Sequence, residues 1–265
     1  MNLILVEQSE CSETADGHLQ VHLSPKDRRS IHIKTVLKLV AHDTARVGII
    51  GGDMFDSEVI IDEGYRLILR KENIRMVSER VDEDISIILA FPRPKGLGRM
   101  FPVFSQQGVR SIRVCNAARV EKSYWGSHII NHSYYNPALL KGLEQANVST
   151  RLPDLSFDPR PFDKFLEDAD IEFPREQFIR LLCHPHDASP LTDTLIETCR
   201  ERREQGLGCE VVVAIGPEGG WLDFELALLI EKYHFACVSF SPRILSTDVA
   251  VTSVVAIISD ALRRT

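Results

Sequence analysis

The sequence predicts an α/β fold, a parallel sheet with helices on both faces, preceded by a small β domain. From about residue 85 onward, compact apolar runs alternate with amphipathic stretches of helical length, which is the pattern of strand–helix–strand units. Before residue 75, short apolar runs follow one another with turn residues between them. Because 265 residues are enough for two modest domains, we expect a β domain over 1–75 and an α/β domain over 76–265.

Four strand runs and one helical run predict the β domain. The strand runs are NLILV, ARVGIIGG, SEVIID and YRLILR, which are short and separated by turn-forming or charged residues. The stretch IHIKTVLKL predicts a helix. This composition favours a small barrel or sheet over a helical domain.

Five strands and five helices are predicted in the α/β domain. The strand runs are ISIILAF, VRSIRVC, FIRLLCHP, CEVVVAIG and FACVSFS. The helical runs are residues 97–107, NPALLKGLEQA, LTDTLIETCRERREQ, WLDFELALLIEKY and TDVAVTSVVAIISDALRR. Residues 147–177 are rich in Pro and Asp without a sustained period, so we expect a long ordered loop there with a short helix over 162–167.

Composition places the chain among soluble globular proteins. Hydrophobic residues make up 44% of it, and no run of eighteen uncharged apolar residues occurs. The start, MNLILVEQSE, lacks the basic segment and the long apolar run of a signal peptide. The six cysteines form no CxxC pair, which argues against a zinc ribbon or a disulfide framework. We therefore expect a cytoplasmic protein with reduced thiols, no metal and no membrane partner.

The charge balance restricts how the chain would bind nucleic acid. A formal net charge of −7 disfavours nonspecific adhesion over the whole surface, so an RNA partner needs a local basic patch. Two stretches offer one, residues 25–38 and 110–122. The first contains Lys26, Arg28, Arg29, His32, Lys34 and Lys38, and the second contains Arg110, Arg113, Arg119 and Lys122. The alternative for both is an ordinary solvated face.

A glycine-rich turn follows the predicted strand CEVVVAIG. Its residues are Gly216-Pro217-Glu218-Gly219-Gly220, and ligands of open α/β sheets bind at such carboxyl ends of strands. Glycine allows close approach of the backbone and proline stiffens the exit, so the turn can offer peptide groups to a flat ligand. Neither GxxxxGK[ST] nor GxGxxG is present, which makes phosphate binding the weaker interpretation, and a purely structural turn stays an alternative.

The next strand ends in a comparable turn, SFSPRILSTDVA. Ser241-Pro242 is followed by the basic residue Arg243 and then by a helix start. Thr247 is a candidate N-cap and Asp248 suits the first helical turn, so helix capping explains part of this segment. Both interpretations, capping and ligand binding, are compatible.

IGPEGG and SPRILSTDVA, about two dozen residues apart, together resemble the paired signatures of the RsmE family of 16S ribosomal RNA methyltransferases, in the SPOUT superfamily. Two further stretches are similar to the family. RRSIHIKTVLKL resembles the basic, His-containing stretch of its N-terminal PUA-like β-barrel, and LEQANVSTRLPDL resembles the segment that links the two halves of its catalytic domain. The match therefore extends over most of the chain.

The resemblance implies a SPOUT-type trefoil-knotted parallel sheet over 76–265 and a PUA-like RNA-binding β-barrel over 1–75. In this superfamily the knot forms the pocket for S-adenosylmethionine, and the active site is completed in a homodimer. The implied cofactor-binding residues are Leu182, His184, Ile215, Gly216, Pro217, Glu218, Gly219, Gly220, Phe240, Ser241, Ile244 and Leu245.

The chain departs from the family at several positions of the second signature. Where the family usually has Gly before the RIL segment, this sequence has Ser241 two residues before Arg243. Where the family commonly reads RTET, this sequence has Ser246-Thr247-Asp248-Val249. The missing arginine at 246 and threonine at 249 affect contacts with RNA or substrate rather than a pocket built from backbone groups.

The family reaction transfers the methyl group of S-adenosylmethionine to N3 of a uridine in 16S ribosomal RNA. The substrate is either free rRNA or the rRNA within the small ribosomal subunit, and the sequence leaves both alternatives open. Arg243 is the candidate catalytic residue, because a guanidinium keeps its charge and can stabilise a uracil anion. Asp248 and Glu218 are alternatives as proton acceptors. Residues expected to bind RNA in the N-terminal domain are Arg28, Arg29, His32 and Lys38.

Two other functions stay open from the sequence. One is a SPOUT methyltransferase that acts on another RNA, such as tRNA or a different rRNA site. The other is a noncatalytic RNA-binding relative, which the departures at Ser246 and Val249 suggest.

Overall fold

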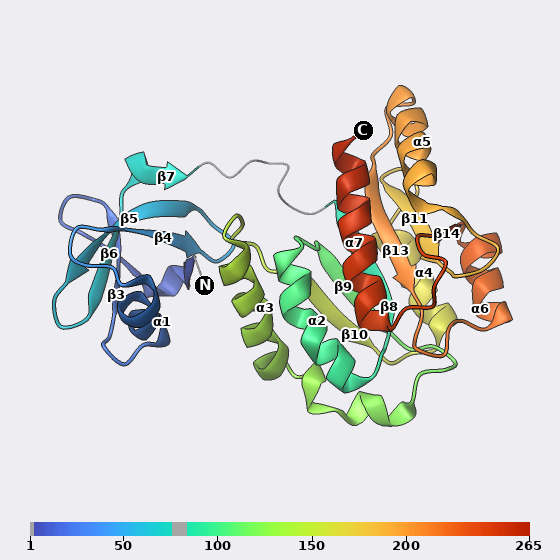
Figure 1. Ribbon diagram of the computed structural model, residues 1–265, viewed down its shortest axis with the longest axis horizontal. Helices are drawn as coiled ribbons and strands as arrows, with labels where there is room; N and C mark the ends of the chain where they lie inside the picture. Colours follow the sequence, from blue (N-terminus) through green and yellow to red (C-terminus); the bar gives the residue numbers. More distant parts are fainter. Residues whose placement is uncertain (1–2, 76–83) are drawn as a thin grey trace. The chain divides into compact units, whose positions relative to one another are not determined.

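The computed structural model describes residues 3–75 and 84–265, which form two compact units (Figure 1). The first unit contains the described residues up to 75 together with Leu139–Leu152. The second contains residues 84–138 and Pro153–Thr265. No helix among the described residues is long and apolar enough to span a membrane.

The first unit is built on a curled, mainly antiparallel sheet. Along the sheet the strands are β1 (Ile4–Val6), β4 (Thr44–Ile49), β5 (Met54–Ile61), β6 (Tyr65–Leu69), β3 (Leu19–Leu23) and β2 (Cys11–Glu13), with β7 (Ile74–Arg75) on β5. All four predicted strand runs form strands, and the pairing of β1 with β4 is parallel. The sheet buries an apolar core on its inner side, which includes Val21, Val47 and Leu67.

The predicted helix of this unit begins earlier than the apolar pattern indicated. It consists of α1 (Arg28–His32) and a following π-helical turn, Ile33–Leu37. The Asp27 side chain accepts a hydrogen bond from the Arg29 backbone N–H at 2.7 Å and caps the first turn. The helix ends at Lys38, whose positive φ of 54° places it in the left-handed region.

Leu139–Leu152 packs on the first unit, although it lies inside the range expected from sequence for the second domain. It includes the second half of α3 (His132–Ala146). Leu143 contacts a small core with Leu3 and Met54, and the buried Glu144 forms two hydrogen bonds with Arg28. These contacts are long-range in sequence, which is why local patterns did not reveal them.

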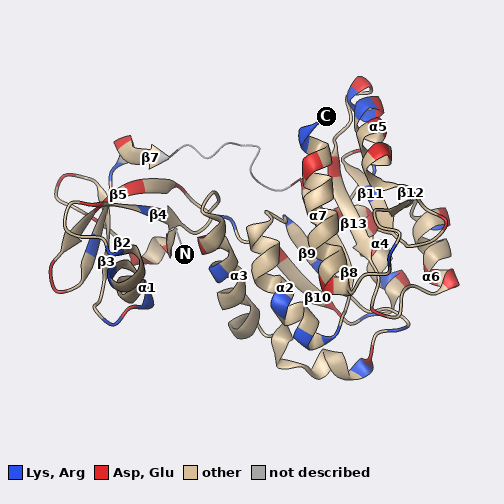
Figure 2. Ribbon diagram, viewed as in Figure 1, with Lys and Arg blue, Asp and Glu red and all other residues tan. Residues whose placement is uncertain are grey.

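The second unit is a seven-stranded parallel sheet, as the alternation of strands and helices predicted. Along the sheet the strands are β10 (Asp154–Asp158), β9 (Ser111–Cys115), β8 (Ile85–Ala90), β13 (Glu210–Ile215), β11 (Phe178–Cys183), β14 (Ala236–Ser239) and β12 (Ser189–Pro190). Every pairing is parallel. The central strands β8 and β13 are largely apolar and buried, and Figure 2 shows the charged residues mainly along helices and loops.

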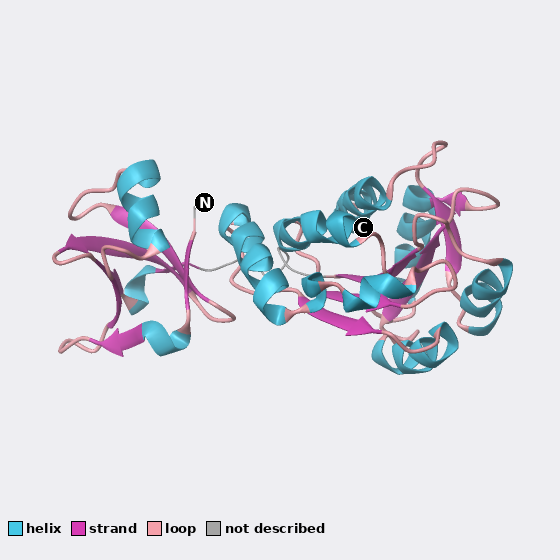
Figure 3. Cartoon of the chain, turned by 90° about the horizontal axis from the view of Figure 1, so that it is seen from below, coloured by secondary structure: helices cyan, strands magenta, loops and turns pink. Residues whose placement is uncertain are grey.

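Helices cover both faces of this sheet (Figure 3). They are α2 (Pro94–Gln106), α4 (Phe162–Glu172), α5 (Leu191–Glu204), α6 (Asp223–Ala227) with a π-helical continuation Leu228–Lys232, and α7 (Thr247–Arg263). Helix α7 packs against both α2 and α5. Its buried stripe contains Val251, Val255 and Ile258, spaced as a helix requires to cover a sheet.

The expectation for residues 147–177 is wrong in part. Instead of a long loop with a short helix, the segment contains the edge strand β10 and the eleven-residue helix α4. In β10 the apolar side chains Leu155 and Phe157 alternate with polar ones, and such a short alternation is easily missed. Helix α4 continues to Glu172 because Phe165, Leu166 and Ala169 bury one face.

Candidate functional site

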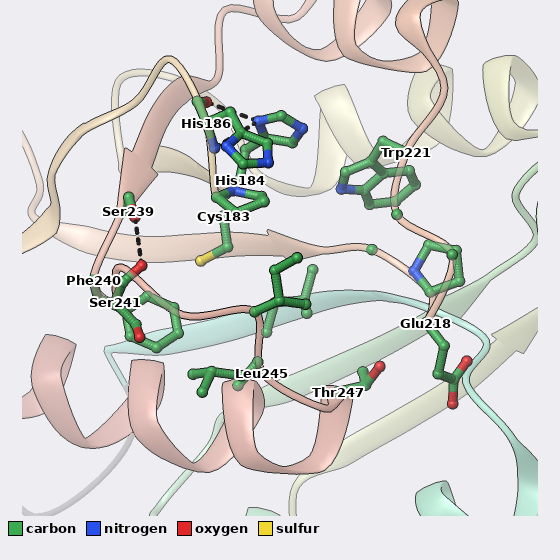
Figure 4. Close-up of a pocket in the computed structure, with 18 of the residues that line it drawn as sticks. Cys183, His184, His186, Glu218, Trp221, Ser239, Phe240, Ser241, Leu245 and Thr247 are labelled. Atoms are coloured by element: carbon green, nitrogen blue, oxygen red, sulfur yellow. Dashed lines mark hydrogen bonds between the residues drawn. The ribbon is translucent and has the colours of Figure 1, made fainter.

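Three neighbouring strands end at one edge of the parallel sheet and form the floor of a cavity. Cys183 at the end of β11 lies in register with Ile215 of β13 on one side and with Val238 of β14 on the other. The cavity measures about 390 Å³ and is lined by the segments that leave these strands (Figure 4). Both turns singled out in the sequence therefore meet at the same site.

All residues expected to bind the cofactor line this cavity, with the exception of Leu182. Leu182 is completely buried, and its neighbour Cys183 lines the cavity instead. Leu182 lies one residue before the end of β11, in its buried part, whereas the cavity begins at Cys183, the last residue of the strand. The predicted catalytic residue Arg243 also lies at the cavity.

Several lining residues were not predicted from the sequence. They are Arg119, Cys183, Pro185, His186, Trp221, Val238, Ser239, Thr247 and Ala250. Most adjoin a predicted position, but Arg119 lies on the loop after β9, far away along the chain. Its position in the second basic stretch was the only signal in the sequence.

The glycine turn is shaped by close contacts that larger residues would disturb. A Cβ atom at Gly216 would lie 3.1 Å from Nε1 of Trp221, and one at Gly219 would lie 2.9 Å from Cδ of Arg119. Gly220 has a φ of +72°, which L side chains rarely adopt, and its N–H donates to the Pro217 carbonyl at 2.8 Å. Arg119 donates a hydrogen bond to the Gly219 carbonyl, so the loop after β9 holds the turn.

Two glutamates connect the glycine turn to the neighbouring loops. Oε1 of Glu218 accepts a hydrogen bond from the Arg93 backbone N–H at the start of α2, at 2.8 Å. Glu225, which is fully buried, accepts from the N–H groups of Ala118 and Leu222, both at 2.8 Å. The carboxylate of Glu225 thereby satisfies one donor in the loop after β9 and one just before α6, and it holds that loop against α6.

Trp221 carries a buried hydrogen-bond donor without a partner. Its indole ring is 5% exposed and stacks on Phe162 at a centroid distance of 5.0 Å. Among the described residues, no acceptor lies within hydrogen-bond distance of Nε1. The ring lines the cavity, and Figure 4 shows the nitrogen on the edge that faces its interior. An unsatisfied buried donor destabilises a fold, so a hydrogen-bond acceptor on a ligand in the cavity would be stabilised by pairing with this N–H group.

The second turn joins β14 to α7. The Ser241 hydroxyl accepts a hydrogen bond from the Arg243 N–H at 3.1 Å, and the Ser239 hydroxyl donates to the Ser241 carbonyl at 3.3 Å. The N-cap of α7 is Ser246 rather than Thr247, which is the first helical residue and buried, so that prediction was one position late. Asp248 lies in the first turn, as predicted.

Asp248 is held as a carboxylate. Its Oδ1 accepts a hydrogen bond from the Ser246 hydroxyl at 2.6 Å, and its Oδ2 accepts from Arg99 at 2.7 Å. These two partners hold the pKa of Asp248 below its ordinary value. A carboxylate stabilised in this way is a weak proton acceptor, which favours the capping role over the role of a base.

The end of β11 contributes two histidines and a thiol to the cavity. Nδ1 of His184 lies 2.8 Å from the backbone carbonyl oxygen of His186, which orients the His184 ring in the loop (Figure 4). Burial raises the pKa of Cys183 to about 12, so this thiol stays protonated and unreactive at neutral pH. Among the described residues, no group of three possible metal ligands comes together.

The N-terminal residues expected to bind RNA differ in their surroundings. The Arg29 side chain is 12% exposed and pairs with both Glu10 and Asp27. Hydrogen bonds from Arg29 hold the pKa values of these two carboxyl groups below their ordinary range. Arg28 pairs with Glu144 but is largely exposed, His32 is half-buried, and Lys38 is exposed at the helix end. The side chain of Arg29 therefore serves the fold of the first unit.

Comparison with known proteins identifies the family. The model of the RNA methyltransferase domain matches residues 79–259. The chain is 27% identical to a ribosomal RNA small subunit methyltransferase E of Treponema pallidum, over 97% of this chain and 90% of that protein. It is 25% identical to ribosomal RNA small subunit methyltransferase E 1 of Borreliella burgdorferi, over 94% of both chains.

Solved structures show the same fold. A ribosomal RNA small subunit methyltransferase E of Neisseria gonorrhoeae, bound to S-adenosyl methionine, superimposes with a TM-score of 0.71 at 15% identity and covers 98% of this chain and 97% of its own. A Legionella pneumophila protein described as a putative methyltransferase with the bound cofactor SAM gives a TM-score of 0.68 at 18% identity, with 98% of both chains covered. The family match confirms the similarity that the two turns predicted: this chain belongs to the RNA methyltransferase domain family.

Proposed function

We propose that this chain transfers the methyl group of S-adenosylmethionine to N3 of a uridine in 16S ribosomal RNA. The observation that carries the proposal is the cavity at the ends of β11, β13 and β14, where both signature turns meet in a member of the RNA methyltransferase family. The relatives from Treponema pallidum and Borreliella burgdorferi, similar over nearly the whole chain, are small subunit methyltransferases. Two structures of the same fold hold the cofactor.

The cavity suits S-adenosylmethionine in size and in chemistry. A volume of about 390 Å³ lies within the range of small-molecule sites, and apolar side chains such as Leu245 and Ile215 stand beside backbone groups of the two turns. The unpaired N–H of Trp221 adds a buried donor that a ligand acceptor would satisfy. When bound, the cofactor supplies a methyl group activated by its sulfonium, so the reaction needs neither a metal nor a nucleophilic side chain.

Replacing Trp221 with phenylalanine tests whether the indole N–H serves the cofactor. Phenylalanine keeps an aromatic ring against Phe162 but removes the donor that has no partner. We expect affinity for S-adenosylmethionine, measured by calorimetry, to fall roughly fivefold to thirtyfold, which is what a hydrogen bond of about 1–2 kcal/mol contributes. The thermal stability of the cofactor-free protein should stay equal or increase. Equal affinity of both proteins would show that the N–H does not contact the cofactor.

Arg243 has the position and the charge to stabilise the uracil anion. It lies on the cavity wall, is exposed, and pairs with no carboxylate in residues 3–75 and 84–265. Glu218 and Asp248, the two other candidates, already accept hydrogen bonds from Arg93 and from Ser246 and Arg99. In the proposed reaction Arg243 therefore orients the uracil and offsets the negative charge that develops when N3 loses its proton.

The chemistry also sets a requirement for the RNA. Uridine N3 lies on the base-pairing edge, so the target must be unpaired or flipped out before it can enter the cavity. The opening of the cavity must then accept one nucleotide together with its flanking phosphates.

The finer architecture is part of the proposal. In the strand order β8–β13–β11–β14, β13 lies between two strands that precede it in sequence, and α7 packs back on β8 and β13. This order supports a trefoil knot around the cofactor. The curled sheet of the first unit supports a PUA-like module that binds RNA through Arg28, His32 and Lys38. We further propose a cytoplasmic homodimer that acts on 16S rRNA, free or within the small ribosomal subunit.

Primer extension on ribosomal RNA tests the function. A methyl group at N3 blocks base pairing, so reverse transcription of wild-type 16S rRNA should stop at the modified uridine, and a strain without this gene should lose the stop. Reintroduction of the gene should restore it. An unchanged stop in the deletion strain would disprove the proposal. A loss of methylation from tRNA or from another rRNA site would identify a different RNA substrate, and absence of cofactor binding in calorimetry would identify a noncatalytic relative.

A further inference from the structure

Five positively charged residues lie on segments that line or adjoin the cavity, and we propose that their side chains form the surface that binds the phosphates of the substrate RNA strand. We call this surface the cationic rim. Its members are Arg93, Lys95, Arg119, Lys122 and Arg243. This inference rests on the proposed function and extends it, because it assigns contacts with the RNA phosphates to the second unit in addition to the N-terminal residues predicted from sequence.

Contacts between the loops bring the rim residues to the cavity. Arg119 and Arg243 line the cavity directly, and the N–H of Arg93 donates to Glu218, which also lines it. Lys95 is two residues beyond Arg93 and Lys122 is three residues beyond Arg119, so neither Cα lies more than about 11 Å from its neighbour on the rim. Figure 2 shows blue segments at the start of α2 and on the loop that follows β9.

The rim cations are exposed and are not neutralised by the protein. In the described part of the chain, no carboxylate lies within ion-pair distance of any of the five, and Arg119 donates only to the Gly219 carbonyl. The acidic residues in the same segments are Glu121 and Glu218, and Glu218 is engaged by a backbone N–H. The rim therefore keeps a net positive charge on a chain whose formal charge is −7.

Other arginines of the second unit serve its fold instead. Arg113 pairs with Asp154 and Glu172, Arg110 pairs with Glu210, and Arg180 is buried against Asp170. In the basic stretch at 110–122, Arg110 and Arg113 therefore form ion pairs, whereas Arg119 lines the cavity and Lys122 follows it three residues later. Arg119 and Lys122 have the free charge that phosphate contacts require.

An exposed aromatic ring beside the rim favours a single strand over a duplex. Tyr134 is 43% exposed and packs against Phe101 of α2. Its hydroxyl would lie 3.4 Å from a Cβ at Gly98, and Gly98 is three residues from Lys95, on the same side of α2. A base stacked on Tyr134 would lie next to a rim cation, which is the arrangement of single-strand binding sites.

The test compares two triple variants that change the net charge equally. One removes rim cations, Arg93→Gln with Lys95→Gln and Lys122→Gln, and leaves the cavity-lining Arg119 and Arg243 in place. The control removes three exposed arginines, Arg175→Gln with Arg200→Gln and Arg203→Gln. Arg175 precedes the amino end of β11, and Arg200 and Arg203 end α5, so the control sites lie at the opposite edge of the sheet from the cavity.

Binding of a fluorescent 20-nucleotide single-stranded RNA of mixed sequence is measured by anisotropy at several salt concentrations. For the rim variant we expect affinity to fall roughly 10- to 100-fold at 0.1 M salt, and the slope of log affinity against log salt to decrease by about 2, from about 0.7 for each lost phosphate contact. The control should change affinity less than about threefold. Tyr134→Ala should weaken binding of the strand roughly tenfold and binding of a duplex of equal length far less.

The results separate this inference from the proposed function. The cationic rim would be contradicted by an equal loss of RNA affinity in both triple variants, or by no loss in the rim variant. Tighter binding of the duplex than of the single strand would contradict it as well. Calorimetry with S-adenosylmethionine and methylation of 16S rRNA by the wild-type protein test the function by themselves. A wild-type protein that methylates the RNA, together with a rim variant that binds RNA normally, would contradict only the rim.

Discussion

Replacement of Gly219 with valine is expected to lower the affinity for S-adenosylmethionine at least about 100-fold, which corresponds to about 2.7 kcal/mol, while the protein stays folded. A Cβ at this position would approach Cδ of Arg119 to 2.9 Å, and the side chain of Arg119 would have to leave the Gly219 carbonyl. The branched side chain and the displaced arginine would then both occupy the opening of the cavity, which Gly219 and Arg119 line. Calorimetry measures the affinity.

The fold of this variant should be preserved, because Gly219 is exposed and has no positive φ that valine would strain. Circular dichroism and the melting temperature check this. Gly126→Val is a matched control, since Gly126 is exposed and a Cβ there would meet nothing within 4 Å. If Gly219→Val binds the cofactor as tightly as Gly126→Val, the cofactor does not use this turn.

The sheet and the site were predictable where a local sequence pattern also determines how an element packs in the fold. A buried parallel strand is an apolar run, and the chain has clear runs for β8, β11 and β13. The carboxyl ends of parallel strands lie at one edge of the sheet, so the sequence alone predicted that the turns after β13 and β14 lie close together. The position at which β11 ends could not be fixed as closely: the cavity begins at Cys183, the last residue of the strand, and Leu182 is buried one residue earlier.

The parts that escaped prediction depend on contacts between segments far apart in sequence. Strand β2 has no apolar run, and β10 has only two apolar side chains. Arg29 looks like an RNA ligand in a basic stretch, yet Glu10 and Asp27 surround it. Trp221 reads as the first residue of a helix, but its place against Phe162 of α4 puts its N–H at the cavity. Charge and residue type alone do not separate a paired arginine from one available for a ligand.

Arg243→Ala is the second large effect that we expect. If the guanidinium stabilises the uracil anion, its removal should lower kcat for methylation of 16S rRNA by about 10²- to 10³-fold, which is typical for the loss of one group that stabilises charge in a transition state. The affinity for S-adenosylmethionine should change less than about twofold, because in the proposed site the backbone of both turns holds the cofactor. Arg175→Ala, an exposed arginine at the opposite sheet edge, is the control.

Arg243→Lys refines this prediction. Lysine restores a positive charge but not the planar, two-pronged donor, so kcat should recover only in part. A loss of cofactor affinity as large as the loss of kcat would instead place Arg243 in the cofactor site. Unchanged kcat in Arg243→Ala would exclude it from the chemistry.

The pH dependence of kcat separates charge stabilisation from a damaged site. Deprotonation of uracil N3 is favoured as the pH rises, so kcat should increase with pH until the uracil of the bound RNA is fully ionised. A guanidinium nearby lowers the pKa of N3, and it stays charged throughout this range. Its removal in Arg243→Ala therefore raises that pKa, and the rising part of the profile should move to higher pH by about one unit, which is about 1.4 kcal/mol. A misfolded or misaligned site would lower kcat by the same factor at every pH, and a profile of unchanged shape would therefore rule out the electrostatic role.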